Sequence, residues 1–296
     1  MSSVILITGA GSGIGKLSAE TLALEGHTVY ATMRDVNGRN AARAQAMRVW
    51  AGERRADLRP LELDVLSQDS ADAAVASVIQ EQGRLDVVMQ NAGHLVIGPT
   101  EAFTAEDMQK AFDTNFYGAQ RVNRAALPQM RHQQSGLMLW ISSTTTKGGF
   151  PPFMGPYGAA KAAMDSLAVS LSYELTRFGI ETSIVVPGAF THGTEHFPSA
   201  GRPSDAARVA AYSRYDGVMD RVGERLSALT PDTATPQAVA DEVARIVGLP
   251  AGSRPARSVI DFVGDGAEQV LALAEEVRIA FAERIGIADL LRPAFR

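Results

Sequence analysis

The sequence contains no cysteine among its 296 residues. Disulfide bonds, thiolate nucleophiles and zinc sites with cysteine ligands are therefore excluded by composition alone. The five histidines show no spacing typical of a metal-ligand cluster, so no metal site is expected. Three of them, His94, His192 and His196, are candidates to border a substrate, and exposure at the surface is the alternative for each.

The sequence also lacks an excess of positive charge and any long apolar run. Its formal net charge is −5 and its pI is near 5.6, which leaves no basic surface for nucleic acid or an anionic membrane. The first apolar run, residues 4–8, ends at a glycine without a preceding positive charge, so neither a signal peptide nor a membrane span is expected. Together with 46% hydrophobic and 21% charged residues, these absences predict a soluble, cytoplasmic globular protein.

Seven short apolar runs, bounded by Gly, Pro or Asn, alternate with Ala-rich stretches of helical length. The runs lack the alternation of a half-exposed strand, which indicates strands buried on both faces of a parallel sheet. The predicted strands are 4–8, 27–33, 58–65, 85–90, 136–142, 180–187 and 257–263, and the predicted helices are about 14–26, 36–52, 67–82, 104–132, 156–178, 236–248 and 265–285. We therefore predict the α/β class, with a single doubly wound Rossmann-type domain over residues 1–296 and helices on both faces of a seven-stranded parallel sheet.

One connection, residues 188–235, is longer than a usual strand-to-helix connection. Connections of this length are typical of lids and binding loops, so we predict a substrate-binding loop or a helical insert there. Its aromatic side chains either line a pocket or pack the insert against the body of the protein. They are Phe190, Phe197, Tyr212 and Tyr215.

A glycine-rich segment, "ITGAGSGIGK" (residues 7–16), follows the first predicted strand and opens a helix. Its glycines stand at 9, 11, 13 and 15, so the pattern is T-G-x-x-x-G-x-G rather than the standard G-x-G-x-x-G. Glycine lets the backbone approach a pyrophosphate, and the helix that begins near Ile14 points free N–H groups at it. The segment predicts a dinucleotide site; a tight strand-to-helix turn is the alternative.

The residues after the second predicted strand are expected to contact the adenosine ribose. An NAD-binding protein usually has an Asp or Glu there, but this chain has Met33 followed by Arg34. A guanidinium suits the 2′-phosphate of NADP through forked, charge-assisted hydrogen bonds. We therefore expect NADP(H) to be favoured over NAD(H). The alternative is a solvated Arg34, with Asp35 binding the ribose.

Further motifs follow in order along the chain: "NAG" (91–93), an asparagine at 115, "ISS" (141–143), Tyr157-x-x-x-Lys161 and "PGAFT" (187–191). With the glycine-rich segment, they make the sequence resemble the classical short-chain dehydrogenase/reductases over roughly residues 4 to 265. The segment "VYATMRD" and the long connection after "PGAFT" resemble the branch that contains steroid and retinol dehydrogenases.

The resemblance implies a cofactor site of matching positions. It implies that the segment from Thr8 to Gly15 holds the pyrophosphate, that Asp64 and Val65 border the adenine, and that the "NAG" residues support the cofactor ribose and the sheet. The implied cofactor-binding residues are Thr8, Gly9, Gly11, Ser12, Gly13, Ile14, Gly15, Arg34, Asp64, Val65, Asn91, Ala92, Gly93, Tyr157, Lys161, Pro187, Gly188 and Thr191. The alternatives are a helix cap for Asp64 and a strand-ending turn for "NAG".

Tyr157 and Lys161 stand four residues apart in a predicted helix and so share one of its faces. A tyrosine with its ordinary pKa of about 10 is a poor acid–base catalyst near neutral pH. A nearby cation favours the phenolate, so we expect Lys161 to lower the pKa of Tyr157 and to bind the nicotinamide ribose. The alternative is a surface pair of the kind found in any helix.

Two more residues complete the predicted catalytic set. Ser143 ends the fifth predicted strand, where its hydroxyl is expected to polarise a substrate carbonyl. Its distance of 14 residues from Tyr157 is one longer than the family's commonest spacing, so Ser142 and Thr144 are alternatives. Asn115 is expected to hold water that links Lys161 to solvent, with a buried structural role as its alternative.

The predicted reaction is hydride transfer between NADP(H) and a small-molecule ketone or secondary alcohol. Phe150, Phe153, Met154 and Phe190 suggest an apolar pocket and hence a lipophilic substrate. Two other functions are weighed against this one: an inactive dinucleotide-sensing protein and a sugar epimerase or dehydratase on the same scaffold. Apolar faces on helices 104–132 and 156–178 predict a homodimer or homotetramer.

Overall fold

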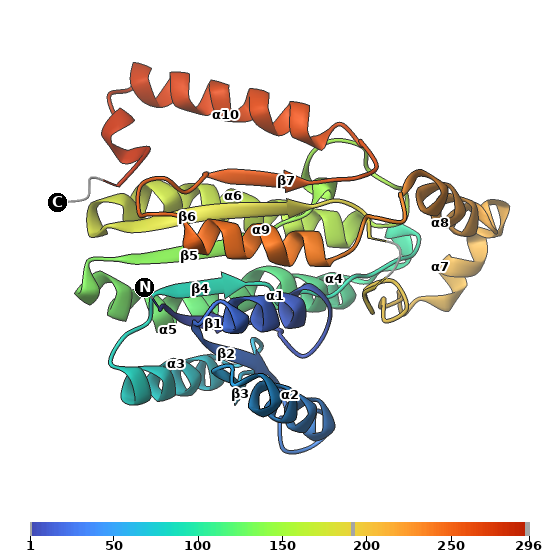
Figure 1. Ribbon diagram of the computed structural model, residues 1–296. Helices are drawn as coiled ribbons and strands as arrows, with labels where there is room; N and C mark the ends of the chain where they lie inside the picture. The colour runs from blue at the N-terminus through green and yellow to red at the C-terminus, as the bar shows by residue number, and fades with distance from the viewer. Residues whose placement is uncertain (1, 191–192, 294–296) are drawn as a thin grey trace.

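A seven-stranded parallel sheet forms the centre of the molecule, and helices cover both of its faces (Figure 1). The computed structural model describes residues 2–190 and 193–293. The strand order is β3-β2-β1-β4-β5-β6-β7. The strands are β1 Val4–Ile7, β2 Thr28–Met33, β3 Leu58–Glu62, β4 Val87–Gln90, β5 Gly136–Ile141, β6 Ile180–Pro187 and β7 Arg257–Ile260. The predicted α/β class and the seven parallel strands are confirmed.

The sheet is buried on both faces, which explains why its strands read as continuous apolar runs. In β1, Ile5 and Ile7 pack toward one helical layer and Leu6 toward the other, and all three are fully buried. One layer consists of α1 Gly13–Leu24, α2 Ala41–Arg54 and α9 Gln237–Gly248, and the other includes α3 Gln68–Gln82, α5 Gly118–Gln133, α6 Gly155–Leu175 and α10 Ala267–Arg284.

The predicted helix 104–132 is not continuous. It consists of α4 Ala105–Phe112, a π-helical turn over Asp113–Tyr117, and α5. The long connection after β6 contains two helices, α7 Ala206–Ala211 and α8 Val218–Leu229, which project beyond the carboxyl ends of the strands (Figure 1). The helical insert expected within residues 188–235 is therefore present, at the edge of the sheet where a doubly wound fold binds ligands.

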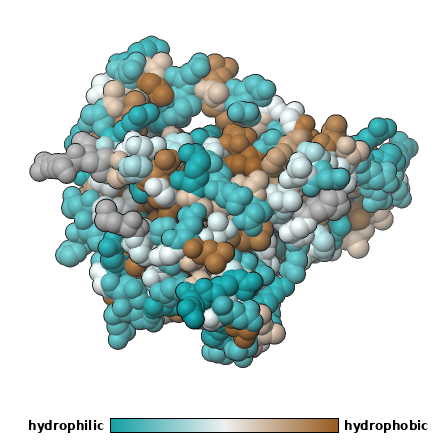
Figure 2. Space-filling view, viewed as in Figure 1, coloured by the Kyte–Doolittle hydropathy of each residue, from teal (hydrophilic) through white to brown (hydrophobic). Residues whose placement is uncertain are grey.

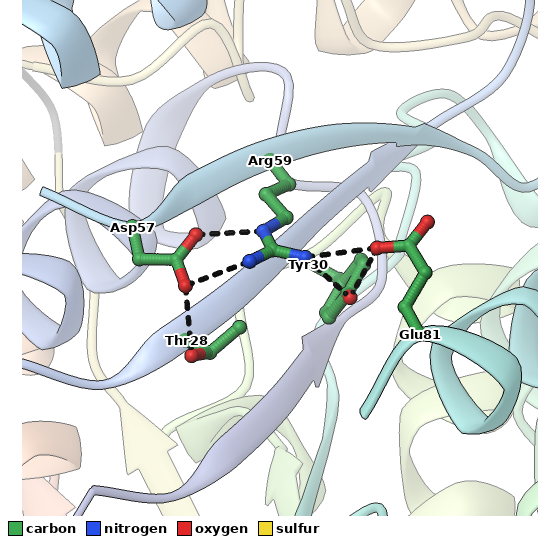
Figure 3. Close-up of polar contacts among 5 residues, drawn as sticks. All are labelled: Thr28, Tyr30, Asp57, Arg59 and Glu81. Atoms are coloured by element: carbon green, nitrogen blue, oxygen red, sulfur yellow. Dashed lines mark hydrogen bonds and ion pairs between the residues drawn. The ribbon is translucent and has the colours of Figure 1, made fainter. Parts of the chain in front are cut away.

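Strand β3 is the outermost strand on one side of the sheet. A polar network holds it there, away from the carboxyl ends of the strands where ligands are expected (Figure 3). The Arg59 guanidinium donates to the carboxylates of Asp57, at 2.6 Å, and Glu81, at 2.8 Å, and the Tyr30 hydroxyl also donates to Glu81. The network joins β3 to β2 and to α3. Pro60 is tolerated in β3 because a strand at the edge has one side that needs no ladder hydrogen bonds.

A buried ion pair connects three elements beneath the ligand edge. Arg257 of β7 donates two hydrogen bonds, of 2.7 and 2.9 Å, to the carboxylate of Asp165 in α6. The Ser142 hydroxyl, just after β5, donates to the same carboxylate at 2.7 Å. The exposed fractions of the Arg257 and Asp165 side chains are 14% and 10%. Removal of either side chain would leave the other charge buried without a partner, which destabilises the fold.

Replacing Arg257 by methionine is expected to reduce the free energy of unfolding by about 3 kcal/mol, because the Asp165 carboxylate would remain buried and unpaired. Urea unfolding at neutral pH measures this change. The control is Arg177→Met, which removes the exposed pair with Asp289 and should leave stability unchanged within error. A loss no larger than that of the control would contradict the structural role given to the buried pair.

Candidate active site

A cavity of about 1790 Å³ lies at the carboxyl edge of the sheet. The glycine-rich segment, the ends of β2, β4, β5 and β6, and helix α8 line it. The strand order reverses between β1 and β4, so the connections that leave these neighbouring strands diverge and open a crevice. On the face seen in Figure 2, hydrophobic surface gathers between the body of the protein and the projecting region of α7 and α8.

The glycine-rich segment is locked against β4 by side-chain hydrogen bonds. Asn91 donates from its amide to the carbonyls of Thr8, at 2.8 Å, and Gly9, at 3.1 Å. The Thr8 hydroxyl accepts from the backbone N–H groups of Asn91 and Ala92, both at 2.9 Å. A Cβ on Gly15 would lie 2.4 Å from the Asn91 amide nitrogen, so only glycine fits there. The "NAG" motif thus fixes the shape of the glycine-rich segment and is more than a strand-ending turn.

The same segment leaves room for an anion on its outer side. Gly11 and Gly13 line the cavity, and a Cβ on Gly13 would meet no atom closer than 3.9 Å. Ser12, the N-cap of α1, makes no side-chain capping bond, so the first N–H groups of the helix stay available. Ile14 and Gly15 also line the cavity. These features fit the pyrophosphate of a dinucleotide.

Met33, Arg34, Asp64 and Val65 line the end of the cavity where the adenosine is expected from the sequence. Asp35, the alternative ribose ligand, is not among the residues that line the cavity, and its carboxylate accepts from the Arg39 N–H at 3.0 Å within its own turn. The helix-cap alternative for Asp64 is wrong. Ser67 is the N-cap of α3, and Asp64 accepts from the Leu66 N–H at 3.0 Å.

Two further arginines line this end of the cavity and were not predicted. They are Arg39 and Arg43, which the turn after β2 and the first turn of α2 bring beside Arg34. Arg43 pairs with Glu195 of the long connection at 2.9 Å. Arg39 and Arg43 reach the cavity because of the path that the chain takes after β2. The spacing of residues in the sequence does not reveal this path.

Tyr157 and Lys161 both line the cavity from the first turns of α6, as the spacing of four residues predicts. Both side chains are almost fully buried. The Lys161 ammonium donates to the Ile141 carbonyl at the end of β5, at 2.8 Å. A Cβ on Gly93 would lie 3.5 Å from the Lys161 Nζ, so the "NAG" segment closes over the lysine.

The pKa of Tyr157 lies above its ordinary value, whereas it was expected from the sequence to lie below. Burial raises the pKa of Tyr157 to about 12, and hydrogen bonding with the Ser143 hydroxyl only partly offsets this rise. Burial also lowers the pKa of Lys161 to about 8, partly offset by the Asp165 carboxylate. Loss of hydration disfavours the charged form of each group, and this effect outweighs the contacts that favour it.

Ser143 is the serine that remains available in the cavity. Its side chain accepts from the Thr145 N–H and hydroxyl at 3.2 and 2.9 Å. Ser142 is committed to Asp165, as described above, so it is not a good alternative. Thr144 belongs to the short 3-10 turn that Ser143 caps. The structure therefore brings Ser143, Tyr157 and Lys161 into one cavity.

Asn115 is fully buried in the π-helical turn between α4 and α5. Its amide nitrogen donates to the carbonyls of His94 and Ala111, both at 2.9 Å, and its oxygen accepts from the His94 N–H at 3.0 Å. These bonds fasten the turn to the segment after β4, beneath Lys161. The π-helical turn was not predicted, although such turns are frequent at functional sites.

Four further predicted residues line the cavity. Pro187 and Gly188, at the end of β6, line it, whereas Thr191 and His192 lie outside the described residues. His94 and His196 both line it, and the His196 Nε2 lies 3.3 Å from the Tyr157 hydroxyl. Within the described ranges, no three His, Asp or Glu side chains are grouped to hold a metal ion. No helix in these ranges has the length and apolar character needed to cross a membrane.

Comparison with known proteins places the chain in a family. The family model described as short chain dehydrogenase matches residues 3–202. A 3-ketodihydrosphingosine reductase of Bacteroides thetaiotaomicron is 36% identical over 190 residues, which are 64% of this chain and 65% of that protein. Estradiol 17-beta-dehydrogenase 1 of Rattus norvegicus is 37% identical over 222 residues, or 72% and 62%. The chain thus covers less than two thirds of the length of these relatives.

Two solved structures agree with this assignment over most of the chain. A short-chain dehydrogenase from Streptomyces avermitilis has a TM-score of 0.75 and 27% identity, covering 97% of this chain and 98% of that one. A variant of actinorhodin polyketide ketoreductase with NADPH has a TM-score of 0.68 and 27% identity, covering 87% and 95%.

The lowered pKa of Lys161 predicts a pH dependence of stability. Between about pH 8 and pH 10 the unfolded chain keeps the lysine proton that the folded protein has lost, so stability rises with pH by about 1 kcal/mol per unit. Urea unfolding of the parent and Lys161→Met across this range measures the difference between them. Tyr157→Phe is the control and should keep the rise, because the Tyr157 phenol remains protonated there. A parallel pH profile for the parent and Lys161→Met would contradict the lowered pKa.

Proposed function

The chain belongs to the short-chain dehydrogenase family, and from this premise we propose that it is an NADP(H)-dependent oxidoreductase that interconverts a ketone and a secondary alcohol. The observation that carries the proposal is the convergence of Ser143, Tyr157 and Lys161 in one cavity with the glycine-rich segment. A hydroxyl donor, a proton donor and a cation are the groups that a carbonyl reduction requires of the protein.

The cofactor would be held along the length of the cavity. The first N–H groups of α1 suit its pyrophosphate, and Asp64 and Val65 border its adenine end. Bound NADP(H) supplies the hydride that is exchanged with the carbon of the substrate. Lys161, fixed by the Ile141 carbonyl, would be the cation that holds the nicotinamide ribose.

The chain's own residues handle the proton. With a pKa of about 12, the Tyr157 phenol is protonated near neutral pH, which is the form that donates to a carbonyl oxygen. The Ser143 hydroxyl stabilises the charge that develops on that oxygen. Proton return through Lys161 and the Asn115 region is the remaining part of the proposal, supported by the close packing of Gly93 against both side chains.

NADP(H) is proposed over NAD(H) because of the charges at the adenosine end. Arg34, Arg39 and Arg43 line it, whereas the Asp35 carboxylate is held in its own turn. Forked guanidinium groups suit a 2′-phosphate, which NAD lacks. The actinorhodin ketoreductase variant was solved with NADPH, in keeping with this proposal.

The proposed substrate is a lipophilic ketone or alcohol. The apolar side chains that line the cavity include Phe103, Met154, Phe190, Phe197 and Met219, whereas Phe150 and Phe153, which the sequence also suggested for the pocket, are not among its lining residues. The relatives named for ketodihydrosphingosine and estradiol support the same class of substrate. Association into a homodimer or homotetramer stays a prediction.

Tyr157→Phe is expected to reduce kcat at least about a thousandfold for any ketone the parent reduces, because the variant has no phenolic proton to donate. The affinity for NADPH should stay within a few-fold of the parent. Loss of NADPH absorbance measures turnover, and fluorescence titration measures cofactor binding. Turnover near the parent rate would refute the catalytic role of Tyr157.

Arg34→Asp is expected to shift the preference from NADPH toward NADH, because the carboxylate repels a 2′-phosphate and accepts from ribose hydroxyls. The ratio of kcat/KM for the two cofactors should change by about a hundredfold or more. Arg54→Asp, on the far end of α2 and outside the cavity, is the control and should leave the ratio unchanged. An unchanged ratio in Arg34→Asp would reject the phosphate contact.

A further inference from the structure

The Tyr157 hydroxyl has a neighbour to which the proposed reaction gives no role. The His196 Nε2 lies 3.3 Å from it, and the two rings meet edge to face with centroids 5.5 Å apart. His196 belongs to the long connection after β6 and, like Tyr157, lines the cavity. The imidazole therefore contacts the phenol inside the cavity.

His196 is positioned by contacts on both sides of it in the chain. On one side, Glu195 pairs with Arg43 at 2.9 Å. On the other, Gly201 forms a parallel bridge with Val96, and its N–H and carbonyl bond to Leu95 and Ile97 at 2.8 and 2.9 Å. The segment that carries the imidazole is thus fastened to the body of the protein at two points, which makes its contact with Tyr157 a feature of the fold.

The imidazole acts at neutral pH as an uncharged hydrogen-bonding group. Burial and, to a smaller extent, the nearby Lys161 and His94 side chains lower the pKa of His196 to about 4. Among the groups that face the Tyr157–His196 contact are the Ser143 hydroxyl and the Lys161 ammonium; no carboxylate contributes to the shift of either pKa. A neutral imidazole carries no charge that could shift the titration of the phenol, so it acts on Tyr157 through a hydrogen bond and by excluding water.

We propose that His196 holds the Tyr157 hydroxyl until substrate binds, and that the substrate carbonyl oxygen then replaces the imidazole as the partner of this hydroxyl. A carbonyl oxygen that accepts the Tyr157 proton has to come within about 3.2 Å of the phenolic oxygen. Ser143 interacts with the same phenolic oxygen, and the His196 imidazole already makes a hydrogen bond with it. Substrate binding therefore breaks the hydrogen bond between His196 and Tyr157, and this loss lowers the affinity for substrate.

This inference rests on the proposed function, and its test separates the two. Steady-state reduction of a lipophilic ketone with saturating NADPH is measured for the parent, His196→Ala, His196→Gln and His132→Ala. His132, at the exposed end of α5, is the matched control for loss of a histidine. A parent that reduces none of a broad ketone panel refutes the proposed function itself, before any variant is compared.

With an active parent, His196→Ala is expected to lower KM about threefold to tenfold, since substrate no longer competes with one hydrogen bond. Its kcat should stay within about threefold of the parent, because Tyr157, Ser143 and Lys161 are unchanged. His196→Gln, whose amide offers a similar hydrogen bond, should restore a KM close to that of the parent. A residue needed only for folding would change stability without this split between KM and kcat.

An unchanged or higher KM in His196→Ala, or a fall in kcat larger than the fall in KM, overturns the inference. Should His196→Ala fail to fold, as judged by thermal unfolding, His196→Leu carries the same test with nearly the same volume. A second readout does not depend on turnover. Alkaline titration of tyrosinate absorbance, with Tyr157→Phe subtracted, should show the pKa of Tyr157 falling from about 12 in the parent when the imidazole is removed, because water then reaches the phenol.

Discussion

The burial of a phenol and an ammonium group side by side is the constraint on which the rest of this site depends. Loss of hydration keeps Tyr157 protonated and weakens the hold of Lys161 on its proton. An ammonium in such a place needs fixed partners, and Lys161 has the Ile141 carbonyl at 2.8 Å and the Asp165 carboxylate one turn further along α6. Asp165 is in turn neutralised by Arg257 from β7. The ion pair below the site is therefore part of what makes a buried lysine tolerable.

Close packing around these two residues explains the small side chains in the neighbouring motifs. A Cβ on Gly93 would lie 2.9 Å from the Asn115 amide oxygen and 3.5 Å from the Lys161 Nζ. Asn115 can meet the backbone of His94 because the π-helical turn carries it there. Gly93 and the π-helical turn that carries Asn115 thus together allow the connection after β4 to pack against Lys161.

Much of this architecture could be predicted from the sequence, because it depends on local signals. Apolar runs such as 4–8 and 136–142 mark the buried strands, and the spacing of Tyr157 and Lys161 places both on one face of a helix. The direction of the pKa shifts could not be predicted, since spacing reveals proximity but not loss of hydration. The π-helical turn and the turn that commits Asp35 to Arg39 were missed for a related reason: both depend on backbone conformation, and Asp35 has a positive φ of 55°.

The long connection after β6 shows how one segment meets both ends of the cavity. Its consecutive residues Glu195 and His196 contact Arg43 of α2 and Tyr157 of α6, respectively. Glu195 neutralises an arginine that a phosphate would also attract, and His196 occupies the hydroxyl that a carbonyl oxygen would also seek. Because the two residues are adjacent in the chain, one short segment lies against both halves of the cavity, and a ligand in either half meets a contact that this segment already makes.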